Sequence, residues 1–244
     1  MTWWSQLFEG MSPQGFFNFS FLPKYISFFT EGVAYTLLLS VAAVLLAVIP
    51  ALLLALMRLS KSRIVRTISG AYIAVFRSTP LLVQLSIIYF GLFGVIRLPS
   101  IMIFGFIDIS RFIPGVVALA LNSAAYVAEI FRAGILAVDI GQTEAARSLG
   151  LSSWQAMRLV VLPQAIKNIL PALANEIVTM VKESSICMAL GMQELMWGAK
   201  TVGGTTLITI APYVLAAIIY FGINFPASKI IEAIERRMRR GDRR

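Results

Sequence analysis

Long apolar runs separated by short polar or basic segments dominate this chain. The runs cover about residues 30–57, 67–95, 113–138, 164–190 and 206–230. Each one is long enough to cross the hydrocarbon core of a bilayer, which takes roughly 20 mainly apolar residues in a helix. No sustained alternation with a period of two suggests a β-barrel. Because only helices and closed barrels satisfy the backbone in lipid, the pattern predicts an all-α polytopic membrane helix bundle with about five transmembrane helices.

The charges between the runs predict how the bundle is oriented. The segment after the first run carries Arg58, Lys61, Arg63 and Arg66 and no acid, so the positive-inside rule assigns it to the cytoplasm. From Lys229 onward the chain holds seven cations and three acids, a net charge of +4. Residues 231–244 are therefore expected to form a basic cytoplasmic tail. An odd number of spans then leaves the N-terminus outside.

The first 29 residues differ from the rest because they are rich in aromatic side chains and contain two prolines. They show neither the basic start nor the compact apolar core of a secretory signal. Trp and Tyr concentrate at membrane–water interfaces, so residues 1–29 are predicted to form an interfacial segment. Residues 30–230 form the predicted transmembrane domain, with a cytoplasmic loop at residues 139–163.

Two breaks interrupt the apolar pattern. Pro80 ends the sequence Arg77-Ser78-Thr79-Pro80 inside the second run; it removes a backbone donor and frees a carbonyl one turn earlier. Either irregular backbone lines a cavity here, or the helix has a simple proline kink. Residues 191–205 are expected to return outside the membrane as a loop with tight turns at their glycines, Gly191, Gly198, Gly203 and Gly204.

Polar residues inside the runs are candidates for structural pairs or for a ligand site. Asn122, Tyr126 and Glu129 are spaced to share one helix face, and Arg132 is placed to pair with Glu129. In the fourth run, Lys182 and Glu183 are adjacent and precede two serines. Charges within spans are expensive and often functional. Helix–helix contacts and a compensated Lys–Glu pair remain the structural alternatives.

Composition narrows the chemistry. The 244 residues are 58% hydrophobic and have a net charge of +9. The cations cluster beside apolar runs, as membrane topology requires, so no nucleic-acid partner is expected. With a single cysteine and no histidine, no metal site, disulfide or His-based catalysis is expected. The chain also lacks the glycine-rich Lys-Ser/Thr loop that wraps nucleotide phosphates.

The segment 141–163, GQTEAARSLGLSSWQAMRLVVLP, predicts two short helices outside the bilayer. Thr143 is a suitable N-cap, with Glu144 in the first turn where the helix dipole favours an acid. Gly150 is a natural stop for that helix. Ser152 or Ser153 is expected to begin the second helix, which is expected to break near Pro163.

The same segment resembles the EAA loop of bacterial ABC importer permeases. Glu144-Ala145-Ala146, then Gly150, then Val160 and Leu162-Pro163 follow the family spacing, with Val160 in place of the usual Ile. Further pieces resemble the polar amino-acid branch of that family. They are Tyr35-Thr36-Leu37, Phe76-Arg77-Ser78-Thr79-Pro80-Leu81-Leu82, Asn122-Ser123-Ala124-Ala125-Tyr126, Gly141-Gln142 and Lys182-Glu183-Ser184-Ser185-Ile186.

The resemblance implies a non-catalytic, multi-pass permease subunit that carries polar or charged amino acids across a bacterial plasma (inner) membrane. Two cytoplasmic ATPase subunits would hold the ATP and Mg, while this chain would hold no cofactor. A second permease chain, identical or related, and an extracytoplasmic solute-binding protein would complete the importer. The residues expected to couple to the ATPase are Glu144, Ala145, Ala146, Arg147, Gly150, Leu162 and Pro163.

A substrate route between the second, third and fourth runs is a separate hypothesis. Glu183 and Glu129 are candidates for binding an ammonium or guanidinium group, and Arg77 and Lys182 for binding a carboxylate. The candidates for hydrogen bonding are Ser184, Ser185, Asn122 and Tyr126. An ion-gradient-driven secondary transporter or channel is the alternative, with the same two acids carrying protons. A membrane enzyme is disfavoured because no nucleophile–base pair is evident.

Overall fold

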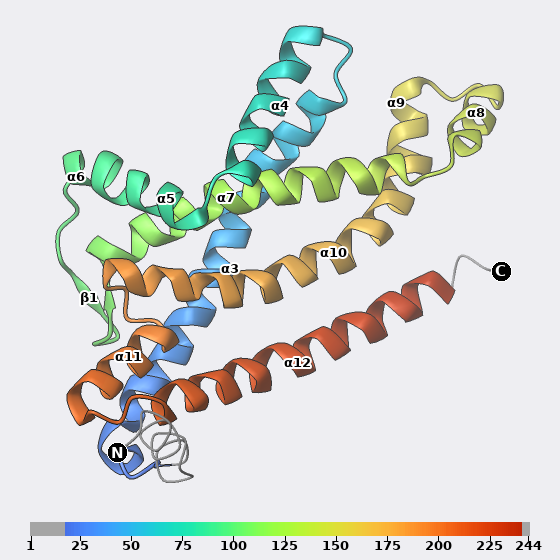
Figure 1. The fold of residues 1–244 in the computed structure, drawn as a ribbon. Coiled ribbons are helices and arrows are strands. Elements are labelled where there is room, and N and C mark those ends of the chain that lie inside the picture. The colour runs from blue at the N-terminus through green and yellow to red at the C-terminus, as the bar shows by residue number, and fades with distance from the viewer. Residues whose placement is uncertain (1–17, 241–244) are drawn as a thin grey trace, which may run out of the picture.

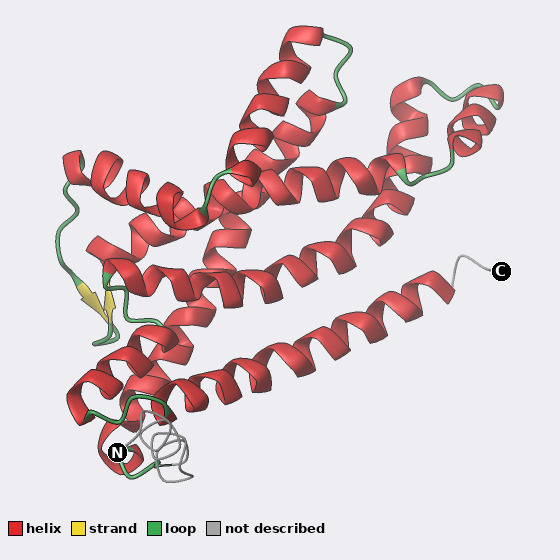
Figure 2. Ribbon diagram, in the orientation of Figure 1, coloured by secondary structure: helices red, strands yellow, loops and turns green. Residues whose placement is uncertain are grey.

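The computed structural model describes residues 18–240, with side chains described as far as residue 238. Long helices dominate it, as Figures 1 and 2 show. Neighbouring helices α7 (Ile109–Leu136), α10 (Leu162–Glu183) and α12 (Ala211–Arg240) pack in that order, and α3 (Leu22–Arg58) packs against α7 and α10. The predicted all-α membrane bundle is confirmed.

Within the described residues, three helices are long and apolar enough to cross a membrane. They are α3, α7 and Ala211–Met238 of α12, and a bent pair of helices qualifies as a fourth. Helix α10, the expected fourth span, is more polar and is not among them. In Figure 1 the start of α3 lies at the opposite end of the molecule from α8, α9 and the end of α12. The count of five and the orientation of the termini stay predictions.

The bent pair consists of α4 (Arg63–Ser78) and a second limb that ends at Val95, with an angle of 106° between them. The second limb begins with α5 (Leu81–Ser86) and continues through the π-helix η1 (Ile87–Leu92) into α6 (Phe93–Val95). A simple proline kink at Pro80 is therefore wrong. The backbone breaks sharply at Pro80, which agrees with the alternative prediction of irregular backbone in this run.

The side-chain amides of Gln84 and Asn122 donate hydrogen bonds to backbone carbonyls at the break before Pro80. Gln84 Nε2 donates to the carbonyl of Phe76 at 2.8 Å and to that of Thr79 at 2.9 Å. Asn122 Nδ2 donates to Gln84 Oε1 at 2.8 Å and reaches the Phe76 carbonyl at 3.4 Å. Both amide side chains are buried. Since buried acceptors must be paired, these amides let the chain break here without an unsatisfied backbone.

We expect Gln84→Leu to destabilise the protein, because it leaves the partly buried Phe76 carbonyl without its shortest hydrogen bond and the buried Asn122 amide without its partner. The cost of such a group is about 1–3 kcal/mol. The unfolding midpoint of the purified protein in detergent measures this effect. Ser86→Ala is the matched control, because the Ser86 hydroxyl donates only within its own exposed turn, to Leu82. Equal midpoints for the two variants would contradict the capping role.

The N-terminal and 191–205 segments form more helix than the sequence predicts. Helix α3 begins at Leu22, inside the expected interfacial segment, and buried Phe29 packs with α11 (Leu195–Thr206) and α12. The loop expected at residues 191–205 is thus wrong, because α11 occupies most of it. Only Gly191 makes a turn there, with φ +73°. Residues 1–17 of the aromatic segment lie outside the described residues, and its place at the interface stays a prediction.

A buried acid explains why α11 forms. Glu194 precedes α11 and accepts hydrogen bonds from the backbone N–H groups of Met196 at 2.8 Å and Trp197 at 2.7 Å. The Tyr220 hydroxyl of α12 donates to the same carboxylate at 3.0 Å. The Leu195 N–H donates to Thr36 of α3 at 3.1 Å. Glu194 therefore caps the N-terminus of α11. The hydrogen bond from Tyr220 connects α11 to α12, and the hydrogen bond to Thr36 connects α11 to α3.

The segment between α6 and α7 contains a short antiparallel hairpin of β1 (Met102–Ile103) and β2 (Ile107–Asp108). Asp108 caps α7 by accepting the Ser110 N–H at 3.0 Å. Partial burial opposes ionisation of Asp108, but hydrogen bonds from Ser110 and Ser100 and the charge of Arg111 hold the pKa of that carboxyl below its usual value. An ionised Asp108 suits the positive end of the α7 dipole.

Candidate coupling loop and translocation cavity

Helix α8 (Ile140–Ser148) carries the first half of the EAA segment. Its N-cap is Asp139, whose carboxylate accepts the Gly141 N–H at 2.7 Å. The prediction that Thr143 is the cap is wrong, because the acid lies one turn earlier and Thr143 is inside the helix. The predicted stop at Gly150 is confirmed by its φ of +84°.

The turn at Gly150 has the hydrogen bonds of a Schellman motif. The Leu151 N–H donates to the Ala146 carbonyl at 3.2 Å, and the Gly150 N–H donates to the Arg147 carbonyl at 3.0 Å. The guanidinium of Arg147 also donates to the Leu151 carbonyl at 2.6 Å. These hydrogen bonds, which involve residues before and after Gly150, fix the turn between the two short helices.

The second helix begins where one of the two predicted serines places it. Ser152 and Gln155 form a reciprocal capping box at the start of α9 (Ser153–Ala156). The expected break near Pro163 is wrong, since α9 continues through the π-helix η2 (Met157–Val161) into α10. The π-helical turn changes the hydrogen-bonding pattern just before the proline. Pro163 then occupies the first turn of α10, where its missing N–H is tolerated.

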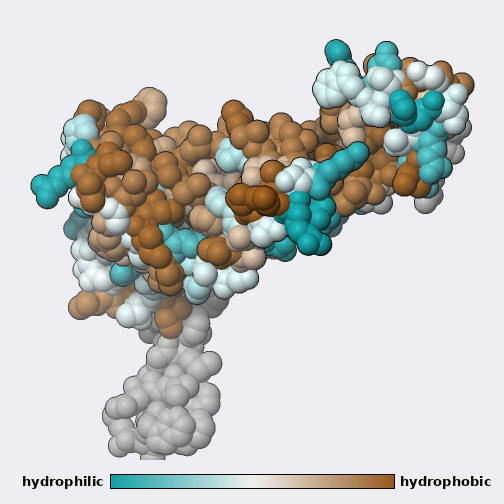
Figure 3. All heavy atoms as spheres, turned by 90° about the horizontal axis from the view of Figure 1, so that it is seen from above, coloured by the Kyte–Doolittle hydropathy of each residue, from teal (hydrophilic) through white to brown (hydrophobic). Residues whose placement is uncertain are grey.

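The predicted coupling residues divide into one packed residue and an exposed set. Ala146 is buried, which anchors α8 on the adjoining helix η2. The exposed members are Glu144, Ala145, Arg147, Gly150, Leu162 and Pro163. Leu149 is 84% exposed and Trp154 is 70% exposed, and the sequence pattern alone did not single them out for this surface. In Figure 3, hydrophilic residues gather at the end of the molecule where Figure 1 places α8 and α9.

A cavity of about 540 Å³ lies between α7, α10 and α12. Its volume is within the range of small-molecule sites. Three of the predicted substrate residues line it, namely Arg77, Tyr126 and Glu129. The Arg77 guanidinium lies over the Tyr126 ring, 5.3 Å from its centroid, in a cation–π contact. The structure thus brings the end of α4 and the predicted polar face of α7 together.

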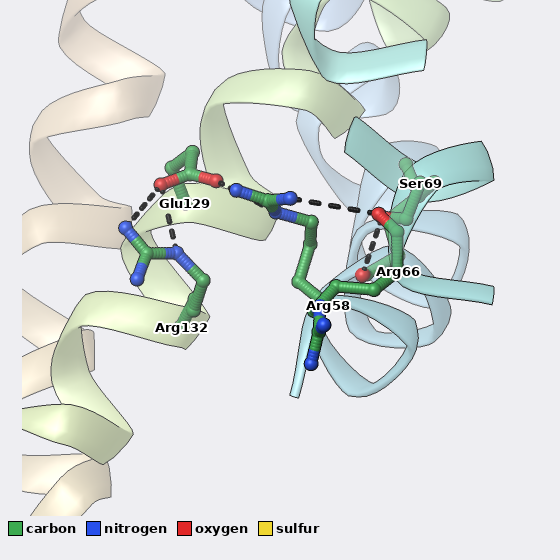
Figure 4. Close-up of polar contacts among 6 residues, drawn as sticks. Arg58, Arg66, Ser69, Glu129 and Arg132 are labelled. Atoms are coloured by element: carbon green, nitrogen blue, oxygen red, sulfur yellow. Dashed lines mark hydrogen bonds and ion pairs between the residues drawn. The ribbon is translucent and has the colours of Figure 1, made fainter. Parts of the chain in front are cut away.

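Glu129 is paired within the protein. Its Oε2 accepts from Arg132 Nη2 at 2.7 Å and Nε at 3.0 Å, as Figure 4 shows. Arg58 Nε, at the end of α3, lies 4.0 Å from the other carboxylate oxygen. The predicted Glu129–Arg132 pair is confirmed. Much of the Glu129 charge is therefore compensated before any substrate arrives.

Glu176 is a second acid of the cavity, and it was not among the predicted site residues. It is buried on α10 and accepts the Ser123 hydroxyl of α7 at 2.8 Å. In the part of the chain that is described, no basic side chain forms an ion pair with it. The rule that singled out Glu183, an acid within an apolar helix, applies equally to Glu176.

The other predicted substrate residues are not at this cavity. Asn122 is engaged with Gln84, as described above. Ser184 and Ser185 donate to carbonyls of their own helix, at 2.9 Å to Val181 and 2.7 Å to Lys182. Over residues 18–238, no ion pair within 4 Å joins Lys182 to Glu183, although the Lys182 charge still acts on the Glu183 carboxyl. A substrate contact at these positions stays a prediction.

Comparison with known proteins identifies the class. Residues 43–240 match the family described as binding-protein-dependent transport system inner membrane component. The match covers most of the chain, and the chain belongs to this family. It is a multi-pass membrane protein and a transport permease subunit.

Named relatives narrow the class to amino-acid ABC transport permeases. The chain is 41% identical to the arginine transport system permease protein ArtQ of Bacillus subtilis, over 92% of this chain and 99% of that one. It is 43% identical to the putative glutamine transport system permease protein GlnP of Rickettsia conorii, over 89% and 95% of the two chains.

Solved structures agree with this class. A crystal structure of an amino acid ABC transporter with histidines is 44% identical and has a TM-score of 0.80, over 91% of this chain and 98% of that one. The MetNI methionine ABC transporter in an inward-facing conformation shares the fold, with a TM-score of 0.66 at 21% identity, over 86% and 97%.

Proposed function

We propose that this chain is the permease subunit of an ATP-driven importer for a polar or charged amino acid in a bacterial plasma (inner) membrane. The exposed α8–α9 loop is the observation that carries the proposal. Its two helices have hydrogen-bonded caps, it projects from the bundle (Figure 1), and it exposes Glu144 and Ala145 of the EAA pattern. The relatives named for arginine and glutamine transport support an amino acid as the substrate.

In the proposed importer, ATP hydrolysis and substrate passage take place in different subunits. Two cytoplasmic ATPase subunits bind ATP and Mg and hydrolyse ATP, whereas this chain has no catalytic role. The α8 helix docks on one ATPase subunit, with Glu144 and Arg147 supplying charge and Leu149 and Trp154 supplying apolar contact. Because α9 continues into α10, movement of the docked loop is transmitted directly to a wall of the cavity.

The cavity between α7, α10 and α12 is the proposed substrate passage. Glu176 offers a carboxylate to an ammonium or guanidinium group, since the side chain that donates to it is the neutral hydroxyl of Ser123. Arg77 offers a guanidinium to the substrate carboxylate. A second permease chain encloses the passage from the other side, and an extracytoplasmic binding protein delivers the substrate.

Reconstituted uptake tests the proposed function against the alternative of an ion-gradient-driven transporter. Vesicles containing the permease and its ATPase are loaded with ATP and supplied with binding protein and labelled amino acid. We expect uptake to require ATP and to persist with a protonophore. Uptake that persists without ATP and stops with the protonophore would support the alternative instead.

We expect Glu144→Lys to reduce both uptake and substrate-stimulated ATPase activity at least about fivefold, because it reverses a charge on the docking surface. A close charge pair across an interface contributes on the order of 1.5 kcal/mol or more. Glu232→Lys is the control, as Glu232 is an exposed acid of α12 that pairs with Lys229. Equal activities for the two variants would contradict a role of Glu144 in docking.

A further inference from the structure

A polar groove outside the translocation cavity lies between the end of α3, α4 and α7. Its volume is about 500 Å³, and its wall on α4 includes Gly70, Ala74 and Ser78. Arg58 comes from the end of α3, and the groove adjoins the cavity, because Arg77, Tyr126 and Glu129 line both. The proposed amino-acid passage uses the cavity and leaves the groove unexplained.

The guanidinium groups of the groove have unused donors. Arg58 Nε is buried without a hydrogen bond, and Arg58 Nη1 reaches only the Arg66 carbonyl, at 3.5 Å. The Arg58 side chain lies on Gly70, where a Cβ would come within 2.9 Å of Nη1. Figure 4 shows Arg58 between Glu129 and the backbone of Arg66. The Arg77 guanidinium lies against the ring of Tyr126.

Glu129, the acid of the groove, does not neutralise the positive charge of its arginines. Glu129 lines the groove, but Arg132 takes one of its carboxylate oxygens through two hydrogen bonds. The adjoining α3–α4 turn adds Lys61, and the start of α4 adds Arg63 and Arg66. A tetrahedral phosphate is a ligand that suits several guanidinium donors in one place.

Helix α4 also has an apolar stripe beside the groove. Ile64, Ile68 and Val75 are 73%, 58% and 57% exposed and share one face of the helix. At 100° per residue, Ala71 borders this stripe on the side of the groove, and Ala74 of the groove wall lies further around the helix in the same direction. The same helix therefore joins an apolar strip, suited to acyl chains, to a cationic groove, suited to a phosphate.

We propose that this groove binds the phosphate of an anionic phospholipid, with the acyl chains along the exposed stripe of α4. Basic pockets between membrane helices on the cytoplasmic side bind anionic head groups. Arg58 ends a candidate span and the basic α3–α4 turn follows it, which places the groove at that boundary. The inference uses the cytoplasmic position expected for this turn and does not depend on which substrate is carried.

The test titrates short-chain phosphatidylglycerol into the delipidated, purified transporter in detergent and follows the unfolding midpoint. A ligand that binds only the native state raises this midpoint with concentration. We expect phosphatidylglycerol to raise it at concentrations at least fivefold lower than phosphatidylcholine of equal chain length. Inorganic phosphate is the second comparison, and an equal effect of phosphate would overturn the assignment to a lipid.

Two variants locate the site. Arg58→Gln removes a donor, and Ala74→Glu adds a negative charge to the groove while every arginine remains. We expect each to weaken the phosphatidylglycerol effect at least fivefold, and Lys61→Gln on the neighbouring turn to change it less than twofold. If Ala74→Glu responds like the unmodified protein, the groove is not the site. Disulfide-linked permease pairs formed through Ile68→Cys would show instead that protein covers the stripe, and would also overturn the proposal.

Discussion

Gly150→Val is expected to reduce substrate-stimulated ATPase activity and uptake at least about tenfold while the chain still inserts and assembles. Gly150 has a φ of +84°, where a β-branched residue is a clear steric outlier. The left-handed conformation costs an ordinary L-residue roughly 1–2 kcal/mol. The turn would relieve this strain by changing its backbone, which separates α8 from α9 and displaces the docking surface.

The control for this prediction is Gly150→Asn, because asparagine is the side chain that most often accepts the left-handed conformation after glycine. We expect this variant to retain most of the stimulated ATPase activity. The space around Gly150 is open, with nothing within 4 Å of an added Cβ, so the two variants differ in backbone preference rather than in crowding. Equal activity of the valine and asparagine variants would contradict the importance of this turn.

Local patterns predicted those features that depend on neighbours in the sequence. The glycine stop at Gly150, the cap at Ser152 and the Glu129–Arg132 pair, three residues apart, all follow from short-range rules. The carbonyl freed by Pro80 was also predictable, because proline always removes the same donor. The partners of that carbonyl were not, since Gln84 and Asn122 come from different helices.

The error at residues 191–205 has a partly tertiary cause. The glycines of this segment indicate turns, but capping by Glu194 and close packing favour α11 instead. Gly198 faces the Phe28 carbonyl, which an added Cβ would approach to 2.7 Å. Gly198 therefore permits close approach between helices rather than turning the chain. The sequence shows that residue 198 is a glycine, but it does not show that Phe28 lies against it.

Glu176 illustrates the same limit at the site. The sequence of α10 contains four charged residues within an apolar run, namely Lys167, Glu176, Lys182 and Glu183. Only the helix packing shows which of them face the cavity, and Lys167 and Glu176 do. Glu183 was predicted because it is an acid within an apolar run, and the sequence contains no signal that places Glu176 rather than Glu183 at the cavity.

Glu176→Gln is the second change with a large expected effect, a fall of about tenfold or more in the uptake efficiency of a cationic or zwitterionic amino acid. A hydrogen bond to a charged group contributes about 1.5–3 kcal/mol, and 1.4 kcal/mol is a factor of ten. Glutamine keeps an acceptor for the Ser123 hydroxyl, so the helix contact is retained while the charge is lost. Initial rates of ATP-driven uptake over a range of substrate concentrations measure the effect.

Ser123→Ala separates charge from packing, because it removes the hydrogen bond to Glu176 and leaves the carboxylate in the cavity. We expect this variant to lose less than about threefold in uptake efficiency, since a single neutral hydroxyl contributes about 0.5–1.5 kcal/mol at most sites. If both variants lose activity equally, Glu176 acts by joining α7 to α10 and not by binding substrate. If Glu176→Gln transports normally, Glu176 is not the acid that binds the substrate, and Glu129→Gln at the same cavity and Glu183→Gln become the next comparisons.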